Sequence, residues 1–408
     1  MKTTARLWPV LALLLAACSL PAPAPTYTAP PPATTTAPPT ETATLAPPTA
    51  TAEPTATVAP TDTPTPAGPQ FLAYVREGEL LVTDVSGGIA GGTTQYTLAG
   101  VDDLVIDLAW SPSGEFLAYV ALALGEPHLF VVYAVGAGTP VDFGLGYNPV
   151  WSPDSTQIAY EQAGNLWLTP SDAPAPRQLT TQDNWAWGRS AFTPDGRALL
   201  VTETSRDFMG AQGNTAFLLK QLALDGSGTL TALPAAESFD GGRLPYNLAY
   251  SPAGDLIAFT TSYHVNACAS GGGLYVQTAA GGDRRELVSP TLNALTAGAA
   301  ETYYLALDYA WSPAGDTVAM SALVRDCADL ATVPPPTAQL SVLDLAGGER
   351  LVIPGLFANP SYDRTGRLIA AAYYPDNLSV SGRIHVYSVA DGQLLLDLGV
   401  GNAPQLQP

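Results

Sequence analysis

The stretch WSPDSTQIAY, residues 151–160, decides the fold because it returns along the chain. Close copies stand at 110–119, WSPSGEFLAY, and at 311–320, WSPAGDTVAM. Each copy has an aromatic residue, then Ser-Pro, then small turn-forming residues and an apolar run. Pro fixes one backbone dihedral, and Asp, Ser and Gly tolerate the remaining turn conformations. The pattern therefore predicts two strands joined by a tight turn.

The apolar part of this pattern recurs seven times between residues 70 and 408. One residue at its centre marks each copy: Ala73, Ala118, Ala159, Leu200, Ala258, Ala319 and Ala370. Successive spacings of 45, 41, 41, 58, 61 and 51 residues are typical of a four-stranded unit repeated radially, with insertions. We predict an all-β fold, a seven-bladed β-propeller of four-stranded antiparallel blades.

The two ends of this region complement each other. The first copy begins directly with its second strand, at PQFLAYV (69–75), whereas the C-terminal GNAPQLQP (401–408) echoes GYNPVWSP (146–153). We predict that the C-terminal segment supplies the missing first strand of blade 1. It would close the ring and remove an exposed sheet edge.

The repeat resembles that of the TolB-like, WD40-like β-propellers of secreted and periplasmic bacterial proteins. Their signature is W-S-P-D-G followed by an apolar strand, and FTPDGRALLV (192–201) and YDRTGRLIAA (362–371) are degenerate copies of it. The resemblance implies the fold and an extracytoplasmic location. TolB-type propellers usually have six blades and follow an α/β domain without equivalent here, so TolB's own role is not implied.

The N-terminus has the features of a secretion signal. Lys2 and Arg6 precede a short apolar run, which is too short to span a bilayer. The following LAAC resembles the lipobox of bacterial lipoproteins, which implies a signal peptide over 1–17 and a lipid on Cys18. The alternative is an ordinary signal peptide in which Cys18 has no role.

Residues 18–69 are dominated by Pro, Thr and Ala and offer almost nothing to bury. We predict a disordered, extended stalk between lipid-modified Cys18 and the propeller at 70–408. The protein would then be held on the outer side of a membrane in the cell envelope.

The net charge of −20 and the absence of a basic stripe argue against nucleic-acid binding and electrostatic docking on anionic lipid. Membrane contact is expected through the lipid alone, and the propeller is expected to be a monomer. We predict no cofactor and no metal site, because the three histidines lack metal-ligand spacing. No G-x-S-x-G nucleophile motif, calcium loop or phosphate loop occurs.

Insertions after the second strand enlarge one face over blades 4 to 7. Cys268 and Cys327 fall at comparable points in the insertions of blades 5 and 6. In an oxidising compartment this placement predicts a disulfide, with two free thiols as the alternative.

On the same face, the loops that lead into blades 4, 5 and 6 carry aromatic and charged residues, which suit recognition of a protein, peptide or glycan. The candidate binding face consists of Trp185, Trp187, Arg189, Asp240, Arg243, Tyr246, Tyr303, Tyr304 and Asp308. The alternative is local packing of these rings under the long loops.

Polar residues also recur three positions before the repeat aromatic. They are Asp107, Asn148, Arg189, Asn247, Asp308 and Asn359, with Asn402 at about the same place in the last copy. Because the first strand is innermost, we expect them to ring the mouth of a central channel and to hold a cation, waters or a ligand tail. The alternative is that they make the hydrogen bonds that start each strand.

The sequence thus favours a lipid-anchored binding or scaffold module without catalytic residues, and not an enzyme. The alternative is an envelope glycan hydrolase or lyase at the channel mouth. Such an enzyme would use Asp240, Glu301 or Asp308 together with Arg189 or Arg243, and would need a strongly shifted carboxylate pKa.

Overall fold

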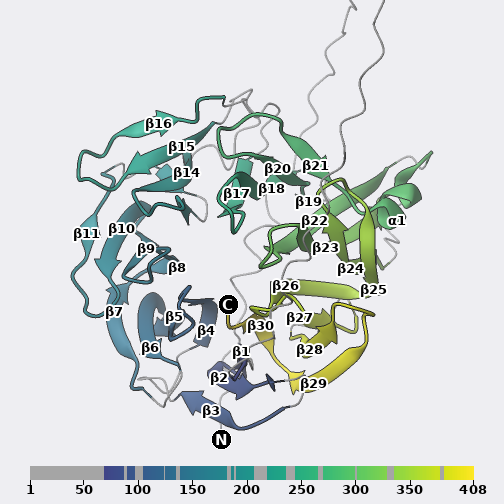
Figure 1. Cartoon of the computed structure of the whole chain (residues 1–408), viewed down its shortest axis with the longest axis horizontal. Helices are drawn as coiled ribbons and strands as arrows, with labels where there is room; N and C mark the ends of the chain where they lie inside the picture. Colours follow the sequence, from purple (N-terminus) through teal and green to yellow (C-terminus); the bar gives the residue numbers. More distant parts are fainter. Residues whose placement is uncertain are drawn as a thin grey trace, which may run out of the picture. The chain divides into compact units, whose positions relative to one another are not determined.

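The computed structural model describes residues 69–86, 90–96, 104–123, 125–134, 138–181, 185–187, 190–205, 218–235, 244–264, 270–298, 301–328, 335–376 and 381–408. The strands among them form seven antiparallel sheets arranged radially in a ring (Figure 1). The predicted seven-bladed propeller is therefore confirmed. The predicted signal peptide, Cys18 and stalk lie outside the described residues.

Each blade is built from four strands that lie side by side, from an innermost strand near the ring axis to an outermost one. Blades 1 to 3 are β30 (Asn402–Leu406), β1 (Phe71–Arg76), β2 (Glu79–Asp84) and β3 (Thr93–Tyr96); β4 (Leu104–Trp110), β5 (Phe116–Ala123), β6 (Glu126–Tyr133) and β7 (Val141–Leu145); and β8 (Tyr147–Trp151), β9 (Gln157–Gln162), β10 (Asn165–Pro170) and β11 (Arg177–Gln178).

Blades 4 and 5 each carry one additional short strand. In blade 4, β12 (Trp185–Trp187) and β13 (Ala191–Phe192) both pair with β14 (Ala198–Ser205), followed by β15 (Leu219–Ala223) and β16 (Leu230–Ala232). In blade 5, β17 (Leu244–Tyr250), β18 (Leu256–His264), β20 (Leu274–Thr278) and β21 (Arg285–Leu287) form the sheet, and β19 (Ser270–Gly271) adds to β18.

The last two blades are regular. They are β22 (Thr302–Trp311), β23 (Thr317–Asp326), β24 (Thr337–Asp344) and β25 (Glu349–Pro354); and β26 (Leu356–Tyr362), β27 (Leu368–Tyr374), β28 (Arg383–Ser388) and β29 (Leu394–Val400). Among the described residues, no helix is long and apolar enough to cross a membrane.

One short helical segment was not predicted. Helix α1 (Pro290–Asn293) continues into a 3₁₀ turn (Ala294–Thr296) after β21. Four residues are too few to show a helical period, but a start signal is present: the Ser289 side chain accepts from the Leu292 N–H, and Pro290 follows it.

The ring closes as the sequence predicts. Strand β30 pairs antiparallel with β1 and becomes the innermost strand of blade 1. The Gln407 N–H donates to the Phe71 carbonyl at 2.9 Å. The Trp110 indole donates to the Gln405 carbonyl at 2.9 Å and ties the closing strand to blade 2. Both ends of the propeller are thus held by one sheet.

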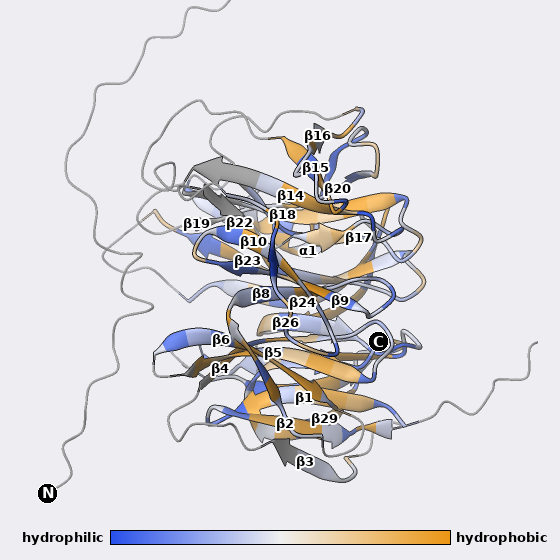
Figure 2. Cartoon of the chain, turned by 90° about the vertical axis from the view of Figure 1, so that its left-hand side faces the viewer, coloured by the Kyte–Doolittle hydropathy of each residue, from blue (hydrophilic) through white to orange (hydrophobic). Residues whose placement is uncertain are grey.

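Among the described residues the core consists of seven apolar clusters, one between each pair of neighbouring blades. Between blades 2 and 3, for example, Ala118 and Leu129 pack against Ile158 and Tyr160. Each blade is therefore buried on both faces. This explains why its second strand is largely an apolar run, as the orange stretches of β1 and β5 illustrate in Figure 2.

The Ser-Pro turn joins strands within a blade and also contacts the preceding blade. The Ser152 hydroxyl donates to Asp154 at 2.6 Å and accepts from the Gln157 N–H at 2.9 Å. In blades 4 to 7 the glycine of this turn has φ near +70° and faces the proline of the turn before it. A Cβ at Gly254 would lie 2.5 Å from Pro194 Cγ. The repeat therefore serves packing between blades as well as turn formation.

Deleting residues 402–408 should remove the inner strand of blade 1 and expose the edge of β1. We expect the melting temperature, measured by circular dichroism, to fall by at least about 10 °C, because a buried strand contributes several kcal/mol. Removing exposed Pro408 alone is the control and should leave it unchanged. An unchanged melting temperature after the longer deletion would refute closure by this strand.

Gly254→Ala should destabilise the ring by about 2–3 kcal/mol, because φ is +75° and the new methyl group meets Pro194. Gly196→Ala is the matched control: its φ is +69°, but the nearest atom to the added Cβ is 3.8 Å away, so only the backbone cost of about 1 kcal/mol applies. Urea unfolding measures both. Equal losses would show that the contact between the turns contributes nothing.

The turn carboxylates should make stability depend on acid pH. Hydroxyl hydrogen bonds hold the pKa of three of them below 3.8: from Ser152 to Asp154, from Thr193 to Asp195, and from Ser312 to Asp316. Since the folded-state pKa is lowered, this stability is complete above about pH 4 and is lost as the pH falls through the folded-state value.

Asp154→Ala should therefore lower the urea midpoint near neutral pH, and the difference from the unmodified protein should shrink near pH 2. Asp172→Ala, at an exposed aspartate outside these turns, is the control. A loss at Asp154 that stays the same at both pH values would contradict this explanation.

Candidate functional site

The predicted ring of polar residues lies at β-bulges in the inner strands. The pairing register of the first two strands slips by one residue in blades 2, 3, 5, 6 and 7, beside Asp107, Asn148, Asn247, Asp308 and Asn359. The three asparagines adopt φ values of 53°, 55° and 51°. Asn tolerates this left-handed conformation, which explains its use at the bulge. Arg189, the predicted member in blade 4, lies outside the described residues.

In blade 1 the bulge residue is Ala403, with φ of 49°, and not Asn402. The Asn402 side chain instead accepts from the Gly382 N–H at 2.9 Å. The prediction was one residue early. The signal was the proline that follows the bulge residue in Asn148-Pro149 and Asn359-Pro360, which Ala403-Pro404 repeats.

Asp308 connects three blades. Its Oδ1 accepts from Asn247 Nδ2 of blade 5 at 3.0 Å and from the Tyr309 N–H at 2.9 Å. Its Oδ2 accepts from the backbone N–H of Asn359 in blade 7 at 3.1 Å and from its Nδ2 at 3.3 Å. A carboxylate has about four acceptor positions, so these bonds occupy its capacity. Asp308 therefore cross-links blades 5, 6 and 7.

A small cavity of about 100 Å³ lies beside this cross-link. Its lining comes from blades 5, 6, 7 and 1: Asn247, Asp308, Tyr309, Asn359, Pro360, Ser361, Pro404 and Gln405. A polar cavity of this size has room for water molecules or for one small polar group of a ligand.

Glu161 is a site residue that sequence reasoning missed. Its side chain is buried in β9, with 3% of the residue exposed, and accepts from Asn148 Nδ2 at 2.9 Å. The signal was its position at the end of the run QIAYE, where the copies FLAYV at 71 and 116 have valine. A buried carboxylate is thus attached to the ring of bulge residues in blade 3.

Several residues expected in loops belong to strands. Trp185 and Trp187 lie on β12, where they pair with Ser205 and Glu203 of β14. Tyr246 lies on β17, and Tyr303 and Tyr304 lie on β22.

The reason is strand length. The second strands of blades 4, 5 and 6 (β14, β18 and β23) have 8, 9 and 10 residues. They extend past the bulge and pair with the residues that precede it. The candidate face therefore stands partly on the sheets themselves, although Arg189, Asp240 and Arg243 lie outside the described residues.

Tyr304 packs inside the protein. Its hydroxyl accepts from the Ser289 N–H at 3.0 Å and lies 3.6 Å from Met320 Sδ. Burial raises the pKa of Tyr304, and it also raises the pKa of Tyr246. These hydroxyls stay protonated at neutral pH. For Tyr304 the alternative expectation, in which the ring packs locally and does not face a ligand, agrees with the structure. Tyr303 is half-buried.

One backbone hydrogen bond joins the face over blades 5 and 6, and a disulfide is formed on it. The Ala306 N–H donates to the Gly272 carbonyl at 2.7 Å and joins the insertion of blade 5 to the inner strand of blade 6. Cys327 is buried and disulfide-bonded. Cys268 lies outside the described residues, so its pairing with Cys327 stays a prediction.

Comparison with known proteins identifies the fold. No protein-family model and no curated protein matches the chain. An oligogalacturonate lyase from Vibrio parahaemolyticus is similar, with 12% identity, a TM-score of 0.53, and 82% of this chain and 85% of that chain covered. Prolyl oligopeptidase B from Galerina marginata has 12% identity and a TM-score of 0.53, with 82% of this chain and half of that chain covered. TolB from Acinetobacter baumannii has 15% identity and a TM-score of 0.43, with 83% and 67% covered.

These structures correct one expectation. The prediction that the protein is not an enzyme is contradicted, because an oligogalacturonate lyase and prolyl oligopeptidases have this propeller. At 12–13% identity the likeness shows the fold alone. The lack of recognisable catalytic motifs in this propeller sequence is therefore no argument against catalysis.

The Asp308 cross-link predicts energetic coupling between blades. Asp308→Ala and Asn247→Ala should each destabilise the protein by about 1–3 kcal/mol in urea unfolding, because each leaves a polar partner unpaired. The double variant should lose at least about 0.5 kcal/mol less than the two single losses together. Strict additivity would show that the bond does not join the blades.

Proposed function

We propose that the protein is a lipid-anchored, extracytoplasmic β-propeller that binds a peptide, protein or cell-envelope glycan where the inner strands of blades 4 to 6 emerge. The observation that carries this proposal is the Asp308 cluster with its cavity. Side chains from blades 5, 6 and 7 converge there. Tyr303 lies on β22, the strand that also carries Asp308, whereas Trp185 and Trp187 lie on β12 of blade 4.

The chemistry of this region supports a polar ligand. The amide oxygens of Asn247 and Asn359 take no part in the bonds to Asp308, because both side chains donate through nitrogen. Ser361 adds a hydroxyl to the cavity lining. Convergent polar groups next to aromatic residues are typical of sites that fix the orientation of peptides and sugars.

The anchor and the location are supported by the sequence. The lipobox-like LAAC before the stalk would tether the propeller through Cys18. The net charge of −20 gives an anionic lipid surface no electrostatic attraction for the propeller. Recognition would then occur at a distance from the membrane.

Catalysis on a bound glycan is the second candidate function. The structural likeness to an oligogalacturonate lyase, at a TM-score of 0.53, favours testing it. Asp308 is an unsuitable general base because four hydrogen bonds already fill its carboxylate. The predicted acid or base would have to be Asp240 or Glu301; Glu301 is exposed.

The experiment is an array of cell-wall glycans and peptides probed with the full-length protein and with a Trp185→Ala, Trp187→Ala double variant. We expect the double variant to weaken binding at least about tenfold, as loss of aromatic contacts at the centre of a site does. Tyr133→Ala, at an exposed ring on the outer part of blade 2, is the control.

Undiminished binding by the double variant would remove this face as the site. Each glycan that binds is also incubated with the protein and analysed by mass spectrometry. Cleaved products would assign catalysis, and intact ligand would assign binding.

A further inference from the structure

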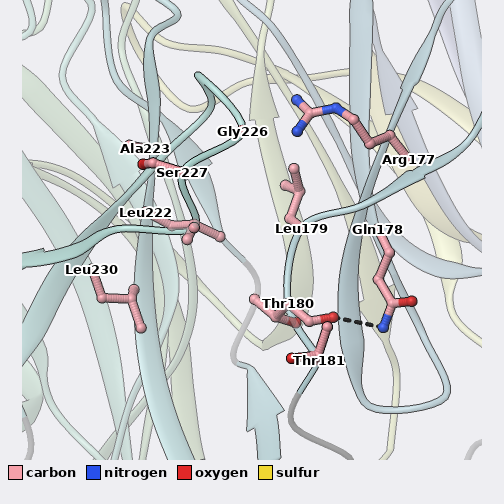
Figure 3. A pocket seen from close by; sticks show the side chains of 11 residues that line it. Arg177, Gln178, Leu179, Thr180, Thr181, Leu222, Ala223, Gly226, Ser227 and Leu230 are labelled. Carbon is pink, nitrogen blue, oxygen red and sulfur yellow. Dashed lines mark hydrogen bonds between the residues drawn. The ribbon is translucent and has the colours of Figure 1, made fainter.

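A second cavity lies far out on the ring, between the outer strands of blades 3 and 4 (Figure 3). It measures about 430 Å³, within the usual range of ligand sites. Leu179 of blade 3 faces Leu222 and Leu230 of blade 4 across it, and all three pack on the core cluster between these blades. We call it the rim groove.

Both blades that border the rim groove have short outer strands. Strand β11 has two residues and β16 has three, whereas β25 and β29 have six and seven. The assigned strand ends at Gln178, although the Leu179 N–H still donates to the Leu166 carbonyl of β10 at 2.8 Å, and residues 179–181 line the groove. A sheet edge that stops early leaves backbone groups open to another chain.

Two backbone carbonyls beside the groove are satisfied by side chains. Arg177 Nη2 donates to the Leu224 carbonyl at 3.1 Å across the gap between the blades. Gln178 Nε2 donates to the Thr180 carbonyl at 2.6 Å. Both donors are exposed, flexible residues, so each bond is replaceable at small net cost by the N–H of an added strand.

We propose that the rim groove binds an extended peptide segment of a partner protein by strand addition. Its backbone N–H groups replace Gln178 and Arg177 on the Thr180 and Leu224 carbonyls. Of the described residues that line the groove, Arg177 alone is charged; its guanidinium also interacts with the neighbouring Asp225 carboxylate, and it is the cation that a peptide carboxylate would contact. The partner segment therefore has an acidic side chain between apolar ones. This site is separate from the proposed binding face.

The test uses a fluorescein-labelled threonine–valine–glutamate–valine–threonine peptide with blocked ends, followed by fluorescence anisotropy with the full-length protein. Companion peptides carry glutamine for glutamate, or N-methyl groups on both valines. We expect binding of the glutamate peptide, loss of binding on N-methylation, and an affinity about fivefold to tenfold weaker for the glutamine peptide.

Arg177→Gln should weaken binding of the glutamate peptide by a similar factor and leave the glutamine peptide unchanged. Thr181→Trp, which fills the groove from an exposed position, should abolish binding of both. Arg364→Gln is the matched control, since Arg364 also donates to a backbone carbonyl elsewhere on the ring. Melting curves verify that each variant is folded.

Three results would overturn the proposal: equal binding of the N-methylated peptide, undiminished binding by folded Thr181→Trp, or no binding by any peptide of a panel that moves the glutamate through all five positions. None of these results bears on the proposed binding face, because no residue of that face is altered.

Discussion

Closure of the ring by β30 on β1 is the constraint on which the rest of the structure depends. With one sheet built from both ends of the propeller, every blade is covered on both faces, and no blade is terminal. The seven clusters between blades then form a continuous circle of apolar contacts. Opening the seam between two neighbouring blades, that is, the apolar cluster that joins them, would expose apolar surface on both blades at once. The ring is therefore expected to unfold cooperatively.

The sequence predicts blade number, strand order and closure, because these depend on a period and on local turn chemistry. Most copies carry both the proline and the glycine of the turn, although Ser155 replaces the glycine in blade 3 and Arg364 replaces the proline in blade 7. The contact of Gly254 with Pro194 shows why these residues recur. Features without a period were missed. Helix α1 is too short to show one, and Glu161 is a single exception inside an apolar run.

The candidate site was predicted as a set of equivalent positions but not as a set of contacts. The 61-residue spacing between Asn247 and Asp308 shows that they are equivalent; it does not show that an amide and a carboxylate meet. That contact depends on the bulges, which rotate each inner strand locally. The loop assignment of Trp185 and Tyr303 failed for a related reason, since pairing beyond the bulge depends on the length of the neighbouring strand.

The seams between blades differ in chemistry, and this difference bears on where function lies. In blades 2 and 3 the repeat tryptophans, Trp110 and Trp151, donate to a carbonyl of the preceding blade, each at 2.9 Å. In blade 4 the residue at this position is Phe192, which has no N–H to donate. The seam before blade 4 is also the one that opens into the rim groove. At Phe192 the hydrogen bond between the blades is absent while the apolar contact between them remains, and we expect binding surfaces where copies depart from the repeat in this way.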